Sequence, residues 1–242
     1  MFCGVRWAGI IPQPFICQYL VLLTMQPDWN TIDTVLLDMD GTVLDLHFDD
    51  VFWTQYVPEC YAQKKGISLE AAHRELAPRF EALRGTLEWY CLDYWSDTLG
   101  LDIPLLKRDV AHLIGPMPGA MDFLHRVRHS GRGLWLVTNA HRKSLALKLE
   151  HTDIGSHFDQ LVSSHDCGLP KEQPGFWRWL AEEFDLDLSR CLMVDDSLAV
   201  LDGARSAGVG QIRYVAKPSS QRPVREAQGY PVVTLLADLS VV

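Results

Sequence analysis

The chain has 242 residues, of which 48% are hydrophobic and 22% are charged, and its formal net charge is −9 at pH 7. This length is enough for one large domain or for a core with a smaller module, and the composition is that of an ordinary globular protein. A negative chain without a basic cluster argues against a nucleic-acid polymer as a partner.

The first 25 residues differ from the rest of the chain. Their apolar stretch is too short and too interrupted to span a bilayer, and the segment lacks the charged start and cleavage site of a signal peptide. We interpret residues 1–25 as a leader outside the mature protein, with translation starting at Met25. The alternative is a weak membrane anchor, and we expect no membrane partner.

A buried strand is predicted over residues 33–39, where the apolar run TVLL leads into Asp38 and Asp40. Ligands of open α/β sheets bind at this end of the strands. Two carboxylates two residues apart point the same way on extended backbone, and they repel each other unless a cation lies between them. Such oxygens suit Mg²⁺ shared with a substrate phosphate. Gly41 allows a sharp turn after the pair. A polar turn without a ligand is the alternative.

Residues 49–115 carry helical patterns and no strand pattern. Gly66 and Gly100 are expected to end helices, Ser68 to begin one, and Pro78 to kink or restart it. The expected helices run from Asp49 or Asp50 to about Lys65, from Ser68, from Thr86 to Leu99 and from Pro104 to Leu113. This segment is predicted to be a helical cap inserted into a core made of residues 26–48 and 116–242.

The third of these helices is rich in aromatic side chains. Trp89, Tyr90, Tyr94 and Trp95 do not share one helix face, so most of them are expected in the core of the cap. One or two of them could instead line a pocket and stack on a nucleobase. Arg74, Arg79 and Arg84 could face either solvent or substrate, and exposure to solvent is the default expectation.

The remaining chain alternates strands and helices, which predicts a parallel sheet with right-handed crossovers. Polar residues follow the strands. Thr138 and Asn139 end the second strand, where Thr138 could contact phosphate, cap the next helix, or do both. Lys171 lies in a later loop, and Asp195 and Asp196 end a fourth strand. Strands are predicted at residues 133–139, 159–164, 191–197, 211–214 and 232–235, and helices at 120–130, from 141, 174–184 and 198–207.

These polar residues all lie at or just beyond strand ends that share one edge of a parallel sheet, so they are expected to meet in one pocket. The order DMDGT (residues 38–42), Thr138, Lys171 and Asp195-Asp196 resembles the four motifs of the haloacid dehalogenase (HAD) superfamily over about residues 33–215. The resemblance implies an α/β fold with a Rossmann-like parallel sheet and an inserted helical cap.

The resemblance also implies a mechanism. Asp38 would be the nucleophile that forms an aspartyl-phosphate, and Asp40 would protonate the leaving group and later activate water. Thr138 and the backbone amide of Asn139 would bind phosphate oxygens. Lys171 would neutralise charge on Asp38 and on the substrate.

The cofactor implied by the resemblance is Mg²⁺. It would be held by the Asp38 carboxylate, the backbone carbonyl of Asp40 and Asp196, with Asp195 a direct or water-mediated ligand. The sequence leaves open which of the last two dominates.

The stretches LEWYCLDYWSDTLGLD, VTNAH and LALKLEHT resemble those of GMP/IMP nucleotidases of the enterobacterial type within the superfamily. The resemblance implies a phosphoric monoester hydrolase that acts on purine nucleoside 5′-monophosphates. The alternative is a phosphatase or phosphomutase for a small sugar phosphate. A non-catalytic phosphate-binding or metal-binding protein is disfavoured because no motif residue is missing. The oligomeric state stays open.

The six cysteines form no C-x-x-C pair, and no histidine spacing indicates zinc. Scattered thiols favour a reducing compartment, so we expect a cytoplasmic enzyme.

Overall fold

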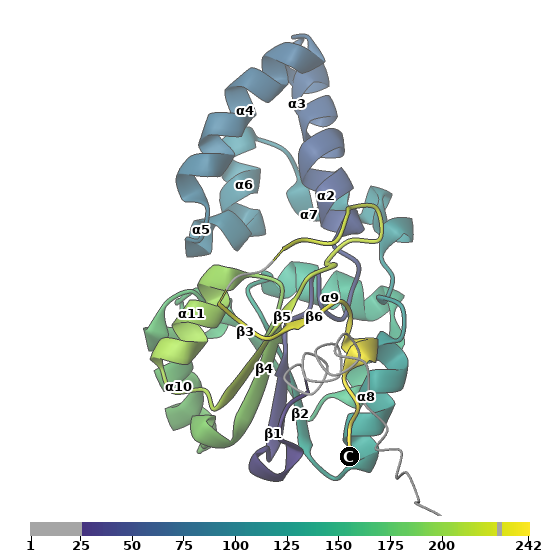
Figure 1. Ribbon diagram of the computed structural model, residues 1–242. Coiled ribbons are helices and arrows are strands. Elements are labelled where there is room, and N and C mark those ends of the chain that lie inside the picture. The colour runs from purple at the N-terminus through teal and green to yellow at the C-terminus, as the bar shows by residue number, and fades with distance from the viewer. Residues whose placement is uncertain (1–25, 227–228) are drawn as a thin grey trace, which may run out of the picture.

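The computed structural model describes residues 26–226 and 229–242, so the predicted leader lies outside the described residues. One six-stranded sheet has the order β3-β2-β1-β4-β5-β6, and every neighbouring pair is parallel (Figure 1). The parallel sheet predicted from the sequence is therefore confirmed. Its strands are β1 (Thr34–Leu37), β2 (Gly133–Thr138), β3 (Gln160–Ser163), β4 (Cys191–Asp195), β5 (Gln211–Val215) and β6 (Val232–Val233).

Side chains alternate across the sheet and build a separate apolar core on each face. In β1, Val35 and Leu37 join the core on the side of α8 (Ala120–His129) and α9 (Arg142–His151). Leu36 joins the core on the side of α10 (Pro174–Phe184) and α11 (Leu198–Ser206). The two pairs of helices cover opposite faces of the sheet (Figure 1). Burial on both faces explains why the strand sequences are almost wholly apolar.

The strand order runs in opposite directions on the two sides of β1. The chain moves from β1 to β2 and β3 on one side, and then to β4, β5 and β6 on the other. In open α/β sheets, this reversal leaves a crevice at the carboxyl ends of the two strands between which it occurs. The crevice here lies after Leu37 of β1 and Asp195 of β4, which are the ends predicted to carry the site.

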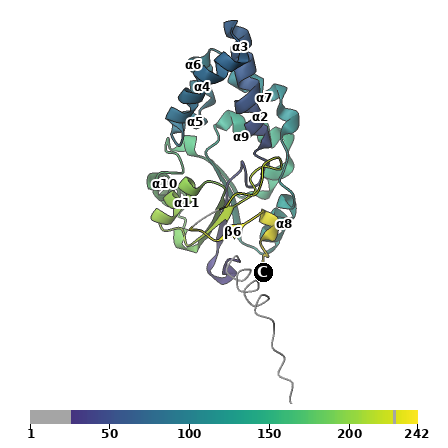
Figure 2. The ribbon, with the colours of Figure 1, turned by 45° about the horizontal axis from the view of Figure 1, so that its top comes forward.

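The helices between β1 and α8 pack on one another, and together they are called the cap below. Their core includes the buried side chains of Phe52, Tyr61, Leu76 and Trp95. The cap stands over the carboxyl ends of the strands (Figures 1 and 2). It comprises α2 (His47–Val51), the π-helical η2 (Phe52–Tyr56), α3 (Val57–Lys65), α4 (Leu69–Leu83), α5 (Leu87–Tyr90), α6 (Leu92–Leu99), α7 (Ile103–Asp109) and η3 (Ala111–Leu113).

Most predicted helix ends in the cap are confirmed, and three details differ. Gly66 ends α3 in the left-handed conformation, and the Ser68 side chain accepts the amide of Ala71 at the start of α4. The helix does not restart at Pro78, because α4 continues through it while its buried face packs against the rest of the cap. The helix predicted over residues 86–99 is two helices, since Cys91 is extended and caps α6 with its sulfur.

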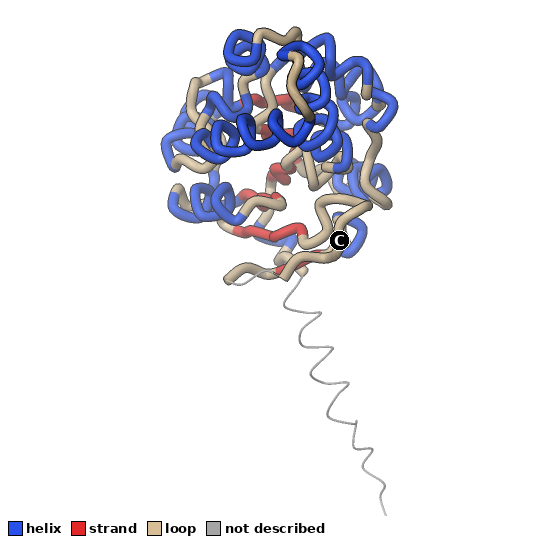
Figure 3. The backbone as a smooth tube through the Cα atoms, turned by 90° about the horizontal axis from the view of Figure 1, so that it is seen from above, coloured by secondary structure: helices blue, strands red, loops and turns tan. Residues whose placement is uncertain are grey.

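The remaining elements are short 3-10 turns that join the larger ones. The helix predicted to reach residue 113 stops at Asp109 and continues as η3. Among the described residues, no helix is long and apolar enough to cross a membrane. In the view from above, strands are visible between the helices (Figure 3). The other 3-10 turns are η1 (Trp29–Thr31), η4 (Asp153–His157), η5 (Ser164–Asp166), η6 (Leu188–Arg190) and η7 (Leu236–Asp238).

Candidate active site

A buried lysine joins the ends of β1 and β4. The Nζ of Lys171 donates to Asp38 Oδ1 at 2.6 Å, to Asp195 Oδ2 at 2.8 Å and to the carbonyl of Val137 at 2.9 Å. Its side chain is 1% exposed. The ammonium is fixed by three acceptors from three neighbouring strand ends, which brings together residues that lie more than a hundred positions apart in the sequence.

A third carboxylate completes an acidic group around Asp38. One carboxylate oxygen from each of Asp38, Asp195 and Asp196 lies within 4.8 Å of the others. Asp196 also accepts a hydrogen bond from Arg225 at 3.1 Å. A Cβ atom on Gly41 would lie 2.8 Å from the Asp196 carboxyl carbon, and the φ of Gly41 is +92°. The sharp turn predicted at Gly41 is therefore confirmed, and glycine is needed there for the carboxylate to approach.

Burial and mutual repulsion raise the pKa values of these acids. Burial raises the pKa of Asp38 to about 8. The charge of Lys171 acts to lower this pKa, and the charge of Asp195 acts to raise it. Burial likewise raises the pKa of Asp195 to about 6 and that of Asp196 to about 7. Burial opposes the charge of Lys171, but Asp195 and Asp38 outweigh it and raise the lysine pKa. Three carboxylates facing one lysine and one arginine retain excess negative charge, which suits a divalent cation with oxygen ligands.

Thr138 and Asn139 lie beside this group, at the end of β2. The Thr138 hydroxyl accepts the amide of Ala140 at 3.0 Å, and α9 is capped by His141 rather than by Thr138. The Asn139 side chain accepts the amide of Lys171 at 2.9 Å and donates to Glu172 at 2.9 Å. Asn139 thus fixes the loop that carries the lysine, a contact that sequence reasoning missed.

Glu172 also contacts the cap. The hydroxyl of Tyr90 donates to Glu172 Oε1 at 2.6 Å. Burial and the Glu172 carboxylate raise the pKa of Tyr90 well above its usual value, so the phenol stays protonated as a donor. This hydrogen bond ties α5 to the loop of Lys171.

A second buried lysine holds Asp40, two residues from Asp38. The Nζ of Lys148 donates to Asp40 Oδ1 at 2.5 Å and to Asp49 Oδ2 at 2.5 Å. The other oxygen of Asp49 accepts from Lys107 at 2.7 Å. Asp40 and Lys148 belong to the core, and Asp49 and Lys107 belong to the cap. The pair Asp38 and Asp40 therefore faces two different lysines, although extended backbone predicted that both would point the same way. The strand ends at Leu37, which releases the two residues from that pattern.

The charges of this second cluster stabilise Asp49 in particular. Burial opposes its ionisation, but Lys107 and Lys148 outweigh burial and lower the pKa of Asp49. Burial raises the pKa of Asp40, against the attraction of Lys148. The sequence held one signal for this cluster. Lys148 follows Leu145 by three positions, so it shares the buried face of α9.

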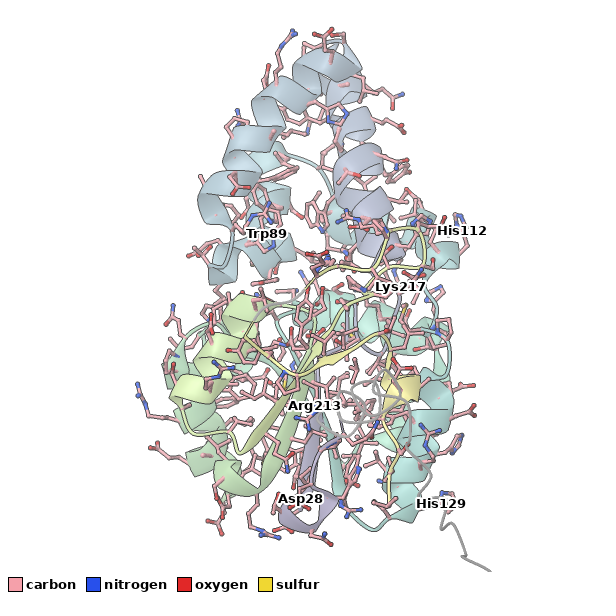
Figure 4. The ribbon with its side chains drawn as sticks, viewed as in Figure 1. Asp28, Trp89, His112, His129, Arg213 and Lys217 are labelled. Atoms are coloured by element: carbon pink, nitrogen blue, oxygen red, sulfur yellow. The ribbon has the colours of Figure 1, made fainter. Side chains whose placement is uncertain are left out.

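A cavity of about 600 Å³ lies between these clusters and the cap, a size typical of small-molecule sites. Its wall on the cap side includes Trp53, Phe80, Arg84, Trp89 and Tyr90. Trp89 lies on the part of the cap nearest the core, whereas Asp28 and His129 lie at the far end of the core (Figure 4). All seven residues predicted for the site line this cavity: Asp38, Asp40, Thr138, Asn139, Lys171, Asp195 and Asp196.

The aromatic side chains of the cap divide between its core and this cavity. Trp95 is 1% exposed and packs against Phe80 at a centroid distance of 5.0 Å. Trp89 and Tyr90 reach the cavity, and the Arg84 guanidinium lies 5.8 Å from the centre of the Trp89 ring. An aromatic face beside a planar cation forms a surface on which a flat ring can stack.

Several known proteins are similar to this chain in sequence. The family model of haloacid dehalogenase-like hydrolases matches residues 32–208. The GMP/IMP nucleotidase YrfG of Escherichia coli strain K12 is 41% identical over 203 residues, which cover 84% of this chain and 91% of that protein. The pyrimidine 5′-nucleotidase YjjG of the same organism is 30% identical over 43% of this chain and 48% of that protein.

Solved structures share the fold. A HAD phosphatase from Thermococcus onnurineus superposes with a TM-score of 0.70 at 25% identity, over 85% of this chain and 94% of that one. A putative β-phosphoglucomutase from Thermotoga maritima gives a TM-score of 0.61 at 20% identity, over 86% and 96%. The matched family model, the nucleotidase relative and the grouping of all four motifs around one cavity lead to the same conclusion: the chain belongs to the haloacid dehalogenase-like hydrolases.

Proposed function

We propose that the protein is a Mg²⁺-dependent phosphatase that hydrolyses purine nucleoside 5′-monophosphates, with GMP and IMP as substrates. The observation that carries the proposal is the position of Asp38, which lies beside Lys171 and two further carboxylates at one end of a cavity. The similarity to the GMP/IMP nucleotidase of E. coli supports the choice of substrate.

In the proposed reaction, an oxygen of Asp38 attacks phosphorus and the bond from phosphorus to the nucleoside oxygen breaks. Asp40 donates a proton to that leaving oxygen, and then takes a proton from the water that hydrolyses the aspartyl-phosphate. Lys171 stays charged throughout and offsets the negative charge that gathers on Asp38 and phosphate. Thr138 and the backbone amide of Asn139 contact phosphate oxygens.

The residues present fit Mg²⁺. The Asp38 and Asp196 carboxylates and the backbone carbonyl of Asp40 would hold the ion, with Asp195 bound directly or through water. The raised pKa values of the three acids support this assignment, because a cation among them would relieve their repulsion. When bound, Mg²⁺ supplies positive charge that lets a phosphate dianion approach an ionised nucleophile.

The cap supplies specificity in this proposal. A purine ring would stack against Trp89 or Tyr90, and the Arg84 guanidinium would face the edge of the base. A small sugar phosphate would leave this aromatic wall without contact. We also propose that residues 49–115 open and close over a core made of residues 26–48 and 116–242. The described cysteines Cys60, Cys91, Cys167 and Cys191 are free thiols, which supports a cytoplasmic location.

The deciding experiment is phosphate release from a panel of nucleoside monophosphates and sugar phosphates, with Mg²⁺ and with a chelator. Release from GMP and IMP that needs Mg²⁺ and is lost in Asp38→Asn would support both mechanism and substrate. Release from sugar phosphates alone would keep the mechanism and overturn the nucleotidase proposal. Binding of Mg²⁺ and phosphate without turnover would indicate a non-catalytic protein.

A further inference from the structure

Three side chains with sulfur or imidazole ligand atoms meet where the cap contacts the core. Cys91 separates α5 from α6 in the cap, His141 caps α9 in the core, and His165 lies in η5 after β3. One ligand atom from each lies within 4.8 Å of the other two. The proposed reaction uses none of these residues.

His165 has no hydrogen-bond partner for either ring nitrogen among the described residues, although both atoms are buried. Buried polar atoms without partners are rare, since each costs about 1–3 kcal/mol of desolvation. A neutral imidazole with a free lone pair is the form that binds metal.

The sulfur of Cys91 faces the same point from the cap. It accepts the amide of Tyr94 at 3.5 Å, at the first turn of α6. The thiolate is the form of cysteine that binds metal. Cys91 is a free thiol.

His141 connects the histidine pair to a carboxylate. Its ring packs edge-on against His165 with centroids 4.8 Å apart, and its Nε2 lies 3.8 Å from Asp93 Oδ2. Asp93 is paired with Lys143 at 2.5 Å, and the Lys143 amide donates to His141 Nδ1 at 3.3 Å. The Lys143 ammonium is thus the positive charge that opposes an incoming cation, and Asp93 screens it. Asp93 or a water molecule would complete the four ligands that Zn²⁺ prefers.

We propose that Cys91, His141 and His165 bind Zn²⁺, and that the bound ion clamps the cap to the core. Cysteine and histidine suit Zn²⁺, whereas Mg²⁺ prefers oxygen ligands, so this site would be distinct from the carboxylate site. Zn²⁺ bonds of about 2.0–2.3 Å require the three ligand atoms to approach by about 1 Å. Because the thiolate belongs to the cap and both imidazoles belong to the core, the ion would hold the cavity closed and slow the exchange of substrate and product.

The binding test uses Co²⁺ as a coloured substitute for Zn²⁺, added to full-length protein in excess Mg²⁺. We expect a cobalt–thiolate absorption band in wild type that is lost in Cys91→Ser and retained in Cys167→Ser, a matched control outside the cluster. His165→Gln should weaken Co²⁺ binding at least tenfold. A wild type without the band, or a band that survives in Cys91→Ser, would overturn the site. Neither readout depends on the nucleotide substrate.

The clamp is tested by titrating Zn²⁺ against hydrolysis of an aryl phosphate in excess Mg²⁺. Wild type should lose at least tenfold in kcat and recover when a zinc-selective chelator is added. Cys91→Ser and His165→Gln should match wild type without Zn²⁺, which also shows that they fold, and should resist inhibition. Equal inhibition of all three proteins would place the effect at the Mg²⁺ site and overturn the clamp.

Discussion

Two buried lysines hold carboxylates under the cap, and they differ in which parts of the chain they join. Lys171 joins Asp38 and Asp195, which both follow strands of one sheet. Lys148 joins Asp40 of the core to Asp49 of the cap, where Lys107 adds a second positive charge. With Asp196 included, the first cluster has three carboxylates but only two cations, Lys171 and Arg225. The second has two lysines for two carboxylates.

This difference separates two tasks. The ion pairs of Lys171 are complete within the core, because Asp38 and Asp195 both belong to it. In the proposed motion of the cap, Asp49 would move with it, so the cluster of Lys148 would be complete only in the closed position. We infer that Lys148 is a positioning residue that orients Asp40 when the cap closes. Its test is a set of variants that break one cluster at a time.

The largest effect is expected for Lys171→Ala. Asp38 and the phosphate then face each other without the ammonium, so the rate of phosphate release should fall about 10³-fold. Circular dichroism and thermal unfolding with Mg²⁺ should show a folded protein. Lys217→Ala removes a lysine from outside the cavity and should turn over normally. Near-normal turnover of Lys171→Ala would contradict its assignment.

A smaller and selective loss is expected for Lys148→Met. Without Lys148, Asp40 loses the donor that holds its carboxylate, and hydrolysis of a nucleoside monophosphate should slow by about 10²-fold. An aryl phosphate with an acidic phenol leaves without protonation, so the first step with that substrate should be far less affected. Pre-steady-state release of the phenol measures this step. Lys148→Arg should restore part of the rate. Equal losses with both substrates would mean that Lys148 does not act through the acid.

Breaking the second cluster from the cap side should cost stability. Asp49→Asn leaves Lys107 without its carboxylate partner and Lys148 with Asp40 alone, and we expect a loss of about 2 kcal/mol in the free energy of unfolding. The matched control is Asp50→Asn, which removes the neighbouring, half-buried carboxylate that pairs with Arg222. Thermal unfolding of both variants decides the point. A larger loss of stability in Asp50→Asn would contradict the claim that Asp49 stabilises the fold through its buried ion pairs.

The smallest expected effect is a difference between the two clusters in how they make the stability of the fold depend on pH. The raised pKa of Asp38 means that metal-free folded protein binds protons more tightly than the unfolded chain, so stability falls as pH rises from about 4 to about 8. The lowered pKa of Asp49 has the opposite sign, and its stabilisation is lost as pH falls below about 4.

Asp38→Asn should therefore be more stable than wild type at pH 8 in a chelator, by about 1 kcal/mol or a few degrees in Tm. Excess Mg²⁺ should reverse this order, because the ion binds the wild-type carboxylates. A variant less stable than wild type in the chelator would show that the pair with Lys171 outweighs the burial of Asp38.

Local sequence patterns were sufficient to predict the strands of the core and the cavity residues that follow those strands. The apolar strands, Gly66, Gly100 and the cap at Ser68 follow from hydrophobicity and backbone preferences of nearby residues. A restart at Pro78, one of the two outcomes expected there, does not occur, because packing of the cap keeps the proline within α4. The break at Cys91 was not expected, because it depends on a sulfur cap that splits the next helix.

The sequence by itself determined the parallel sheet and the meeting of seven residues at one edge, since strand ends in such a sheet converge regardless of the loops between them. Only the tertiary structure decided which lysine each aspartate contacts, and that Cys91 reaches His141 and His165. Those contacts depend on how one set of helices rests on another. That placement arises from packing over the whole cap–core surface and leaves no local spacing in the chain.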